Sequence, residues 1–150
     1  MKGWLLDTNV IAEMSGARPD RKVERWFQSQ PEHLLYLSIL TIAEYHKGIE
    51  HLPPGDVRRP QLSRSVQALE RRFAGRVLPI SDKIALRWGA ISGTVKRLAG
   101  HPPSVIDTLL AATAIEHDLY LATRNVVHVA HSGAAIFNPW KDDTANFPLA

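Results

Sequence analysis

Five short apolar segments of strand length recur along the chain, separated by longer segments with helical periodicity. They cover residues 4–6, 34–38, 77–80, 120–123 and 134–140. None alternates clearly between apolar and polar residues, as a strand with one solvated face would. Short buried strands that alternate with helices are typical of a parallel sheet covered on both faces. The sequence therefore predicts an α/β fold with a central, mostly parallel sheet of about five short strands.

The segments between these strands carry the residues that start and stop helices. Helices are predicted over residues 9–16, after a cap at Asp20, and over 41–52, 61–75, 82–100 and 101–118. Ser81 or Asp82 can cap the fifth of these helices, and Ser104 the last. Glycines at 16, 75 and 100 are the expected stops. Because no repeat or low-complexity tract interrupts this pattern, we expect one domain over residues 1–150.

Composition excludes several classes of protein. No segment approaches the ~20 consecutive apolar residues of a membrane span, and Asp7 interrupts the first apolar run too early for a signal peptide. We therefore expect a cytoplasmic protein without membrane contact. The absence of cysteine excludes disulfides and thiolate zinc sites. A formal charge of +3 is compatible with a polyanionic partner but is not specific for one.

Three carboxylates stand at positions where a parallel sheet forms its functional site. Asp7 follows the first predicted strand, Glu44 lies in an otherwise apolar helical patch, and Asp107 lies in the first turn of the last long helix. Sites in such sheets form at the carboxyl ends of the strands, near the point where the strand order reverses. The three acids are therefore candidates for one site.

Each acid also has an explanation without function. Asp7 can bond a backbone amide of the turn that follows it. Glu44 can be a solvated helix residue that pairs with Lys47, which would contribute only ~0.2–0.5 kcal/mol. Asp107 can interact with the helix dipole for roughly 0.3–1 kcal/mol.

The apolar surroundings of Asp107 argue against a purely structural role. The pattern predicts that Val105, Ile106, Leu109 and Leu110 bury most of this helix. A buried charge needs a partner, and a cation shared with the other acids would supply one. Mg²⁺ prefers oxygen ligands and commonly binds one or two carboxylates together with phosphate oxygens. The acids therefore indicate phosphoryl chemistry.

Four motifs along the chain resemble one known family in order and spacing. They are LLDTNVIAE, SILTIAEYHKGIE, IDTLLAATAIEHDLYLATRN and AIFNPW. Together they resemble the PIN-domain ribonuclease toxins of VapBC toxin–antitoxin systems, particularly the FitB-like subgroup. The resemblance implies a PIN-like α/β/α sandwich, usually a homodimer, that cleaves RNA with Mg²⁺ or Mn²⁺. It also implies inhibition by a cognate VapB/FitA-like antitoxin, through which alone operator DNA is bound.

The resemblance assigns roles to individual positions. Asp7, Glu44 and Asp107 match the family's first, second and third acids, which makes them the expected metal ligands and catalytic residues. Thr123 matches a position where the family carries a hydroxyl group, which can form a hydrogen bond with metal-bound water. The fourth acid of many relatives is missing, because the segment reads TRNVVHVA and places Asn125 there. Asn125 can accept a hydrogen bond from metal-bound water but adds no negative charge.

Histidines and cations complete the candidate residues. His128 can be a general acid or a phosphate contact; with His131 it forms an i, i+3 pair that lacks a third zinc ligand, so both are expected in a loop. Arg124, Lys47 and Arg18 are candidate RNA contacts, because phosphate neutralisation dominates nucleic-acid affinity, with solubilising surface as the alternative.

The aromatic residues have two interpretations. Trp26, Phe27, Tyr45 and Trp88 can build the core or line a groove for an antitoxin helix. Trp140 is expected to anchor the C-terminal strand by packing.

Three functions follow from these residues. The leading hypothesis is a metal-dependent endoribonuclease toxin that cleaves RNA phosphodiester bonds by metal-activated water. The second is a weakly catalytic nucleic-acid-binding protein that regulates transcription with its antitoxin, motivated by Asn125. The third is a phosphatase with Asp7 as nucleophile, although Asn9 stands where such chemistry generally needs a second acid.

Overall fold

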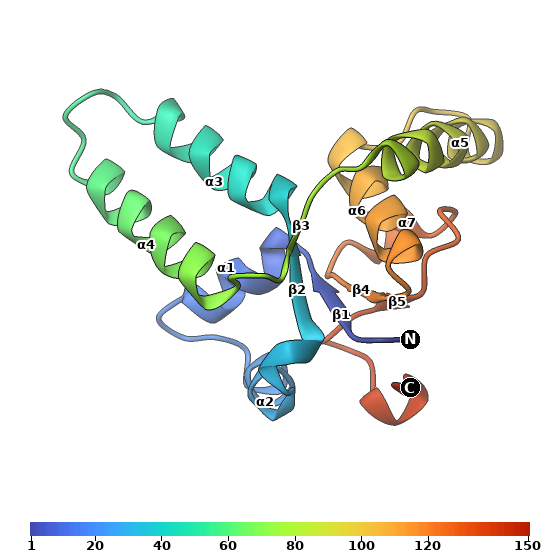
Figure 1. Ribbon diagram of the computed structural model, residues 1–150, viewed down its shortest axis with the longest axis horizontal. Coiled ribbons are helices and arrows are strands. Elements are labelled where there is room, and N and C mark those ends of the chain that lie inside the picture. The colour runs from blue at the N-terminus through green and yellow to red at the C-terminus, as the bar shows by residue number, and fades with distance from the viewer.

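A computed structural model describes residues 1–150, and its centre is a five-stranded parallel sheet (Figure 1). The strands are β1 (Trp4–Leu6), β2 (Leu35–Ser38), β3 (Val77–Leu78), β4 (Tyr120–Ala122) and β5 (Ile136–Phe137). Their order across the sheet is β3-β2-β1-β4-β5, and every neighbouring pair is parallel. The predicted α/β class and the number of strands are confirmed.

Seven helices surround the sheet. They are α1 (Thr8–Ser15), α2 (Arg21–Ser29), α3 (Ile39–His51), α4 (Arg58–Arg72), α5 (Asp82–Ala99), α6 (Val105–Glu116) and α7 (Val126–Val129). Two 3₁₀ turns cover Glu32–Leu34 and Thr144–Asn146. Helices α3 and α4 pack against each other and extend away from one side of the sheet, whereas α5 packs along α6 on the other side (Figure 1).

Helix starts follow from side chains that accept hydrogen bonds from free backbone amides. The Asp20, Ser81 and Ser104 side chains cap α2, α5 and α6, as predicted. Helix α3 begins at Ile39, two residues before the predicted Thr41, because the Ser38 hydroxyl accepts from the amide of Leu40.

Helices α4 and α7 also differ from the sequence prediction. Helix α4 begins at Arg58 rather than after Pro60, because a proline in the first turn lacks only an N–H that has no partner within the helix. The expectation that His128 lies in a loop is wrong, because residues 126–129 form the one-turn helix α7. That turn gives His128 a fixed place beside the candidate site.

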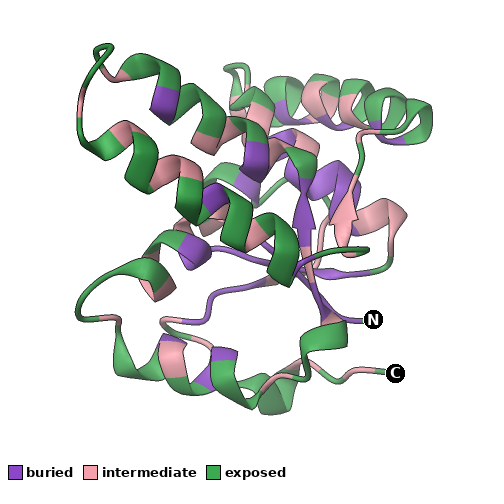
Figure 2. Ribbon diagram, turned by 60° about the vertical axis from the view of Figure 1, so that its left-hand side comes forward, coloured by how far each residue is buried: buried purple, intermediate pink, exposed green.

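The alternation of side chains along β1 divides the core between the two faces of the sheet. Trp4 and Leu6 pack into a core with residues of α1 to α4, whereas Leu5 packs with Leu110 and Ala114 of α6. The burial pattern shows the sheet as the buried centre of the molecule (Figure 2). Successive residues point to opposite faces of a strand, so an unbroken apolar run is what a doubly covered strand requires.

Most of the aromatic candidates belong to this core. Trp26 and Phe27 are buried in the first cluster, and Tyr45 and Trp140 pack against its edge. The Trp88 indole N–H donates to the Thr108 hydroxyl at 3.0 Å, which ties α5 to α6. These contacts support the core interpretation over an open groove.

One residue of α6 was misplaced by the pattern. Val105 was expected to be buried, but it is 55% exposed. It is the first residue of α6, and the buried residues of this helix begin at Thr108. None of the helices combines the length and apolar character that a membrane span requires.

The central strand generates a test of this packing. Leu5→Ala removes a fully buried side chain and is expected to lower the free energy of unfolding by about 2–5 kcal/mol, measured by urea denaturation. Leu86→Ala, at an exposed position of α5, is the matched control and should change it by less than about 0.5 kcal/mol. Equal effects of the two substitutions would contradict the assignment of β1 to the core.

Candidate active site

The strand order reverses between β1 and β4, and this is where the first acid lies. The chain moves from β1 outward through β2 and β3, and then returns to β4 on the other side of β1. Asp7 directly follows β1 and Thr123 directly follows β4. The Thr123 hydroxyl donates to Asp7 Oδ2 at 2.7 Å. The site predicted at the switch point of the sheet therefore begins with a hydrogen bond between two strand ends.

Asp7 is a buried carboxylate that also caps a helix. It is 7% exposed, and its Oδ1 accepts from the backbone N–H of Thr8 at 2.6 Å, at the start of α1. Burial raises the pKa of Asp7, and the negative charges of Asp107 and Glu44 add to this effect, whereas the hydrogen bonds from Thr123 and Thr8 oppose it. The turn chemistry considered for Asp7 is therefore present, but it does not explain why two further acids lie close by.

Glu44 reaches the site from α3 through Thr8. The Thr8 hydroxyl donates to Glu44 Oε1 at 2.8 Å and lies 3.3 Å from the hydroxyl of the buried Thr41. Thr8 thus binds one acid with its backbone and the second with its side chain. The alternative Glu44–Lys47 ion pair does not form.

Asp107 contributes the third carboxylate from the first turn of α6. The Ser104 hydroxyl accepts from its backbone N–H at 3.4 Å, and His128 Nδ1 of α7 lies 3.0 Å from its Oδ2. The Asp107 side chain is mostly buried, whereas His128 is largely exposed. The charges of Glu44 and Asp107 both act on Asp7, so the three predicted acids, from α3, α6 and the end of β1, lie in one neighbourhood. His128 is an additional partner of Asp107.

Asn9, Thr123 and Asn125 lie where many relatives have a fourth acid, and they are linked by hydrogen bonds. Asn9 donates to both Asp7 Oδ2 and the Thr123 hydroxyl at 3.2 Å, and its Oδ1 accepts from the backbone of Arg124 at 3.3 Å. The backbone N–H of Asn125 donates to the Thr123 hydroxyl at 3.0 Å, but its exposed amide side chain makes no hydrogen bond. Asn125 thus stands at the rim of the site with a free side chain.

Thr8 and Asn9 are the residues that sequence reasoning missed as members of the site. Both belong to the D-T-N sequence after β1 and form the start of α1, and this sequence is typical of ordinary helix capping. The signal that could have found them is their position: residues directly after the central strand of a parallel sheet lie at the switch point.

The predicted RNA contacts lie on the protein surface at different distances along the chain from the acids. Arg124, Lys47 and Arg18 are all exposed, and none of them forms an ion pair. The Arg124 guanidinium lies over the Trp140 ring, 5.2 Å from its centroid, which holds it beside the carboxyl end of β4. The structure places Arg124 next to the site, Lys47 one turn beyond Glu44, and Arg18 in the loop after α1.

The donor set fits a hard divalent cation that keeps part of its water shell. No three His, Cys, Asp or Glu side chains are arranged to hold an ion by themselves. The side chains around Asp7 offer oxygen atoms, and the charges of Asp107 and Glu44 both add to the effect of burial in raising the pKa of Asp7. Mg²⁺ and Mn²⁺ prefer oxygen ligands, and Mg²⁺ usually keeps several waters and takes only one or two carboxylates. Carboxylate and hydroxyl oxygens suit such an ion better than zinc, which is usually bound by nitrogen and sulfur ligands.

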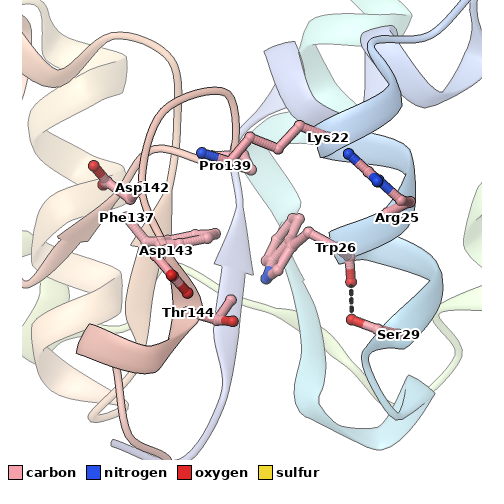
Figure 3. A pocket seen from close by; sticks show the side chains of 9 residues that line it. All are labelled: Lys22, Arg25, Trp26, Ser29, Phe137, Pro139, Asp142, Asp143 and Thr144. Carbon is pink, nitrogen blue, oxygen red and sulfur yellow. Dashed lines mark hydrogen bonds between the residues drawn. The ribbon is translucent and has the colours of Figure 1, made fainter.

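A separate hollow of about 330 Å³ between α2 and the C-terminal segment is not part of this site (Figure 3). Its charged lining groups already bond the backbone: Lys22 donates to the carbonyl of Lys141, and Asp142 and Asp143 accept from backbone amides. None of the three acids lines it. The hydrogen bond from Lys22 to Lys141 joins α2 to the C-terminal segment beside this hollow.

Comparison with known proteins agrees with this geometry. The family model of the PIN domain matches residues 4–129, so the chain belongs to the PIN domain family. It is 36% identical to Toxin FitB of Neisseria gonorrhoeae over 138 residues, covering 92% of this chain and 99% of that protein. It is 35% identical to VapC ribonuclease Y4jK of Sinorhizobium fredii over 137 residues, covering 91% and 97%.

Solved structures give the same relationship. The crystal structure of FitAcB from Neisseria gonorrhoeae contains a chain with a TM-score of 0.80 and 34% identity, covering 91% of this chain and 98% of that one. A chain of VapBC-1 from nontypeable Haemophilus influenzae has a TM-score of 0.70 and 26% identity, covering 92% and 98%. Both similarities extend over more than nine tenths of this chain.

Burial of Asp7 predicts an unusual pH dependence of stability. Its pKa in the folded state lies above its ordinary value of about 4, so between these values the folded state binds more protons than the unfolded state. The contribution of Asp7 to stability is therefore present at low pH and lost as the pH rises through the raised pKa.

We predict that Asp7→Asn, which cannot ionise, raises Tm at neutral pH in EDTA. The difference from the parent protein should shrink as the pH falls towards 4, measured by thermal denaturation across pH. A variant that is less stable than the parent at pH 7, but not at pH 4, would contradict the unfavourable charge at this position.

Proposed function

We propose that this chain is a metal-dependent endoribonuclease toxin of a type II toxin–antitoxin system. The observation that carries the proposal is the convergence of Asp7, Glu44 and Asp107 at the switch point of a PIN-domain sheet. The similarity to Toxin FitB and to VapC ribonuclease Y4jK supports RNA as the substrate and toxicity as the outcome.

In this proposal Asp7, Glu44 and Asp107 are the residues that would hold Mg²⁺ or Mn²⁺. The bound ion supplies an activated water and stabilises the charge that develops on the phosphate. Thr123 and Asn9 orient the Asp7 carboxylate through their hydrogen bonds. Asn125, with its free amide at the rim, orients water, and Thr8 fixes the distance between the first two acids.

The surroundings of the site suit a polyanionic substrate. Arg124, Lys47 and Arg18 neutralise RNA phosphates on either side of the acids. As partners we propose a second copy of the chain and a cognate VapB/FitA-like antitoxin in the cytoplasm, with operator DNA bound only through the antitoxin. Solved relatives include FitAB bound to the IR36 DNA fragment, with a TM-score of 0.82 and 33% identity, which supports this arrangement.

The central test is cleavage of a single-stranded RNA by the antitoxin-free protein. Asp7→Asn, Glu44→Gln and Asp107→Asn should each reduce Mn²⁺-dependent cleavage by at least about 100-fold, because even the partners of metal ligands commonly contribute 10- to 100-fold. EDTA should abolish the activity of the parent protein.

Asp118→Asn is the matched control for these variants. Asp118 is exposed, lies at the opposite end of α6 from Asp107, and has a positive φ of 56°, which asparagine tolerates well. Its cleavage rate should equal that of the parent. Cleavage that survives in Asp7→Asn would exclude the proposed mechanism. A parent protein that binds RNA without cleaving it would favour the weakly catalytic, transcription-regulating alternative.

The missing fourth acid generates a prediction of its own. Asn125→Asp adds a carboxylate at the rim of the site, and it should lower the Mn²⁺ concentration for half-maximal cleavage by roughly tenfold. Asn146→Asp, which adds the same charge at an exposed position near the C-terminus, should leave that concentration unchanged. Equal Mn²⁺ requirements of Asn125→Asp and the parent would place residue 125 outside the metal's surroundings.

A further inference from the structure

Helix α7 separates two hollows that flank the candidate active site. Val127 and His128 line both of them. One hollow, of about 450 Å³, also includes Arg124 and Lys141. The other, of about 400 Å³, lies between α7, the end of α5 and the segment 101–104, and we call it the histidine hollow. Its lining residues are Val95, Ala99, His101, Pro102, Pro103, Ser104, Val127, His128 and His131.

The histidine hollow is continuous with the site through two of its residues. His128 lines the hollow and contacts Asp107 Oδ2 through Nδ1 at 3.0 Å. Ser104 lines it and caps the helix that carries Asp107. The groups next to a phosphate bound at the acids can therefore reach this hollow.

The chemistry of the lining suits a flat, uncharged ring. Val95 is buried at one wall, Pro102 and Pro103 present rigid rings, and three imidazoles complete the lining. No lysine, arginine or carboxylate lines the hollow, so it offers little to a phosphate. Proteins recognise unpaired RNA bases by stacking them on aromatic side chains, including histidine, and by hydrogen bonds to the base edges.

Val127 is the most exposed large apolar residue of the chain, at 84%. It stands on the ridge of α7 between the two hollows, where stacking against a base would cover it. The other hollow is lined by Arg124 and Lys141, and by Asp142, whose carboxylate accepts from the backbone N–H of Asn138. Its two cations suit the phosphate backbone. The histidine hollow therefore offers apolar and aromatic groups that suit a base, whereas the other hollow offers two cations that suit a phosphate.

We propose that the histidine hollow binds an unpaired nucleobase of the RNA substrate, next to the phosphate that is cleaved. This inference rests on the proposed ribonuclease function and deepens it, because it assigns a substrate subsite. It makes the hollow a determinant of where the RNA is cut, and it requires the RNA to be single-stranded at that position.

The test uses an RNA oligonucleotide with one mapped cleavage site and a series in which each base near that site is replaced by an abasic nucleotide. For the parent protein, one abasic position should lower kcat/KM by about 5- to 150-fold, which corresponds to ~1–3 kcal/mol for stacking of one base. Val127→Trp, which fills the hollow from an exposed position, should cause a similar loss on the intact RNA. It should lose little more on that abasic RNA, because the contact is already gone.

Val57→Trp is the matched control, since Val57 is 74% exposed in the loop between α3 and α4, far from α7 (Figure 1). It should behave as the parent on every RNA. Losses that multiply when Val127→Trp acts on the abasic RNA would overturn the subsite. So would unchanged cleavage by Val127→Trp combined with lost binding of the co-expressed antitoxin, which would assign the hollow to that partner. A parent protein that cleaves no RNA would instead refute the proposed function itself.

Discussion

The hydrogen bond between the Thr123 hydroxyl and Asp7 connects the two strands on which the rest of the site depends. Asp7 donates its backbone N–H to the carbonyl of Ala122 at 3.0 Å, so the pairing of β1 with β4 continues into the residues that form the site. A shift in this pairing would separate the hydroxyl from the carboxylate. The pairing of β1 with β4 therefore fixes the position of the buried Asp7 carboxylate.

The negative charge of Asp7 opposes folding, because its surroundings favour the neutral form of the carboxyl group. Burial and two neighbouring acids raise the pKa of Asp7, while hydrogen bonds from Thr123 and Thr8 only partly compensate. The large apolar cores on both faces of the sheet can sustain such a cost. A divalent cation would remove it, because it would turn mutual repulsion among three acids into attraction to one ion. This relief of repulsion is what the proposed function requires of a metal bound by the three acids.

Much of the fold could be predicted because it follows from local signals. The apolar runs gave the strands, and Asp20, Ser81 and Ser104 gave helix starts, since strand burial and capping are properties of neighbouring residues. The one-turn helix α7 was missed because four residues carry too little periodicity to distinguish a turn of helix from a loop. Val105 was misplaced because periodicity does not tell how far a helix end extends beyond the sheet.

The positions of the acids could be predicted more readily than those of the other members of the candidate site. Asp7, Glu44 and Asp107 were predicted from their positions and from family resemblance, and the charges of the last two act on Asp7 in the structure, whereas their roles stay a prediction. Thr8, Asn9 and the contact between His128 and Asp107 depend on how distant segments meet, which one sequence does not encode in a short motif. The histidine hollow likewise exists only because α5, α6 and α7 converge.

Metal binding by the three acids can be tested by anomalous diffraction from crystals of the antitoxin-free protein soaked in Mn²⁺. We predict a manganese peak within bonding distance of carboxylate oxygens of Asp7 and Asp107. The same peak should be absent from Asp107→Asn crystals treated in the same way. A fully occupied manganese ion elsewhere on the protein, with none beside Asp7, would refute metal binding at this site.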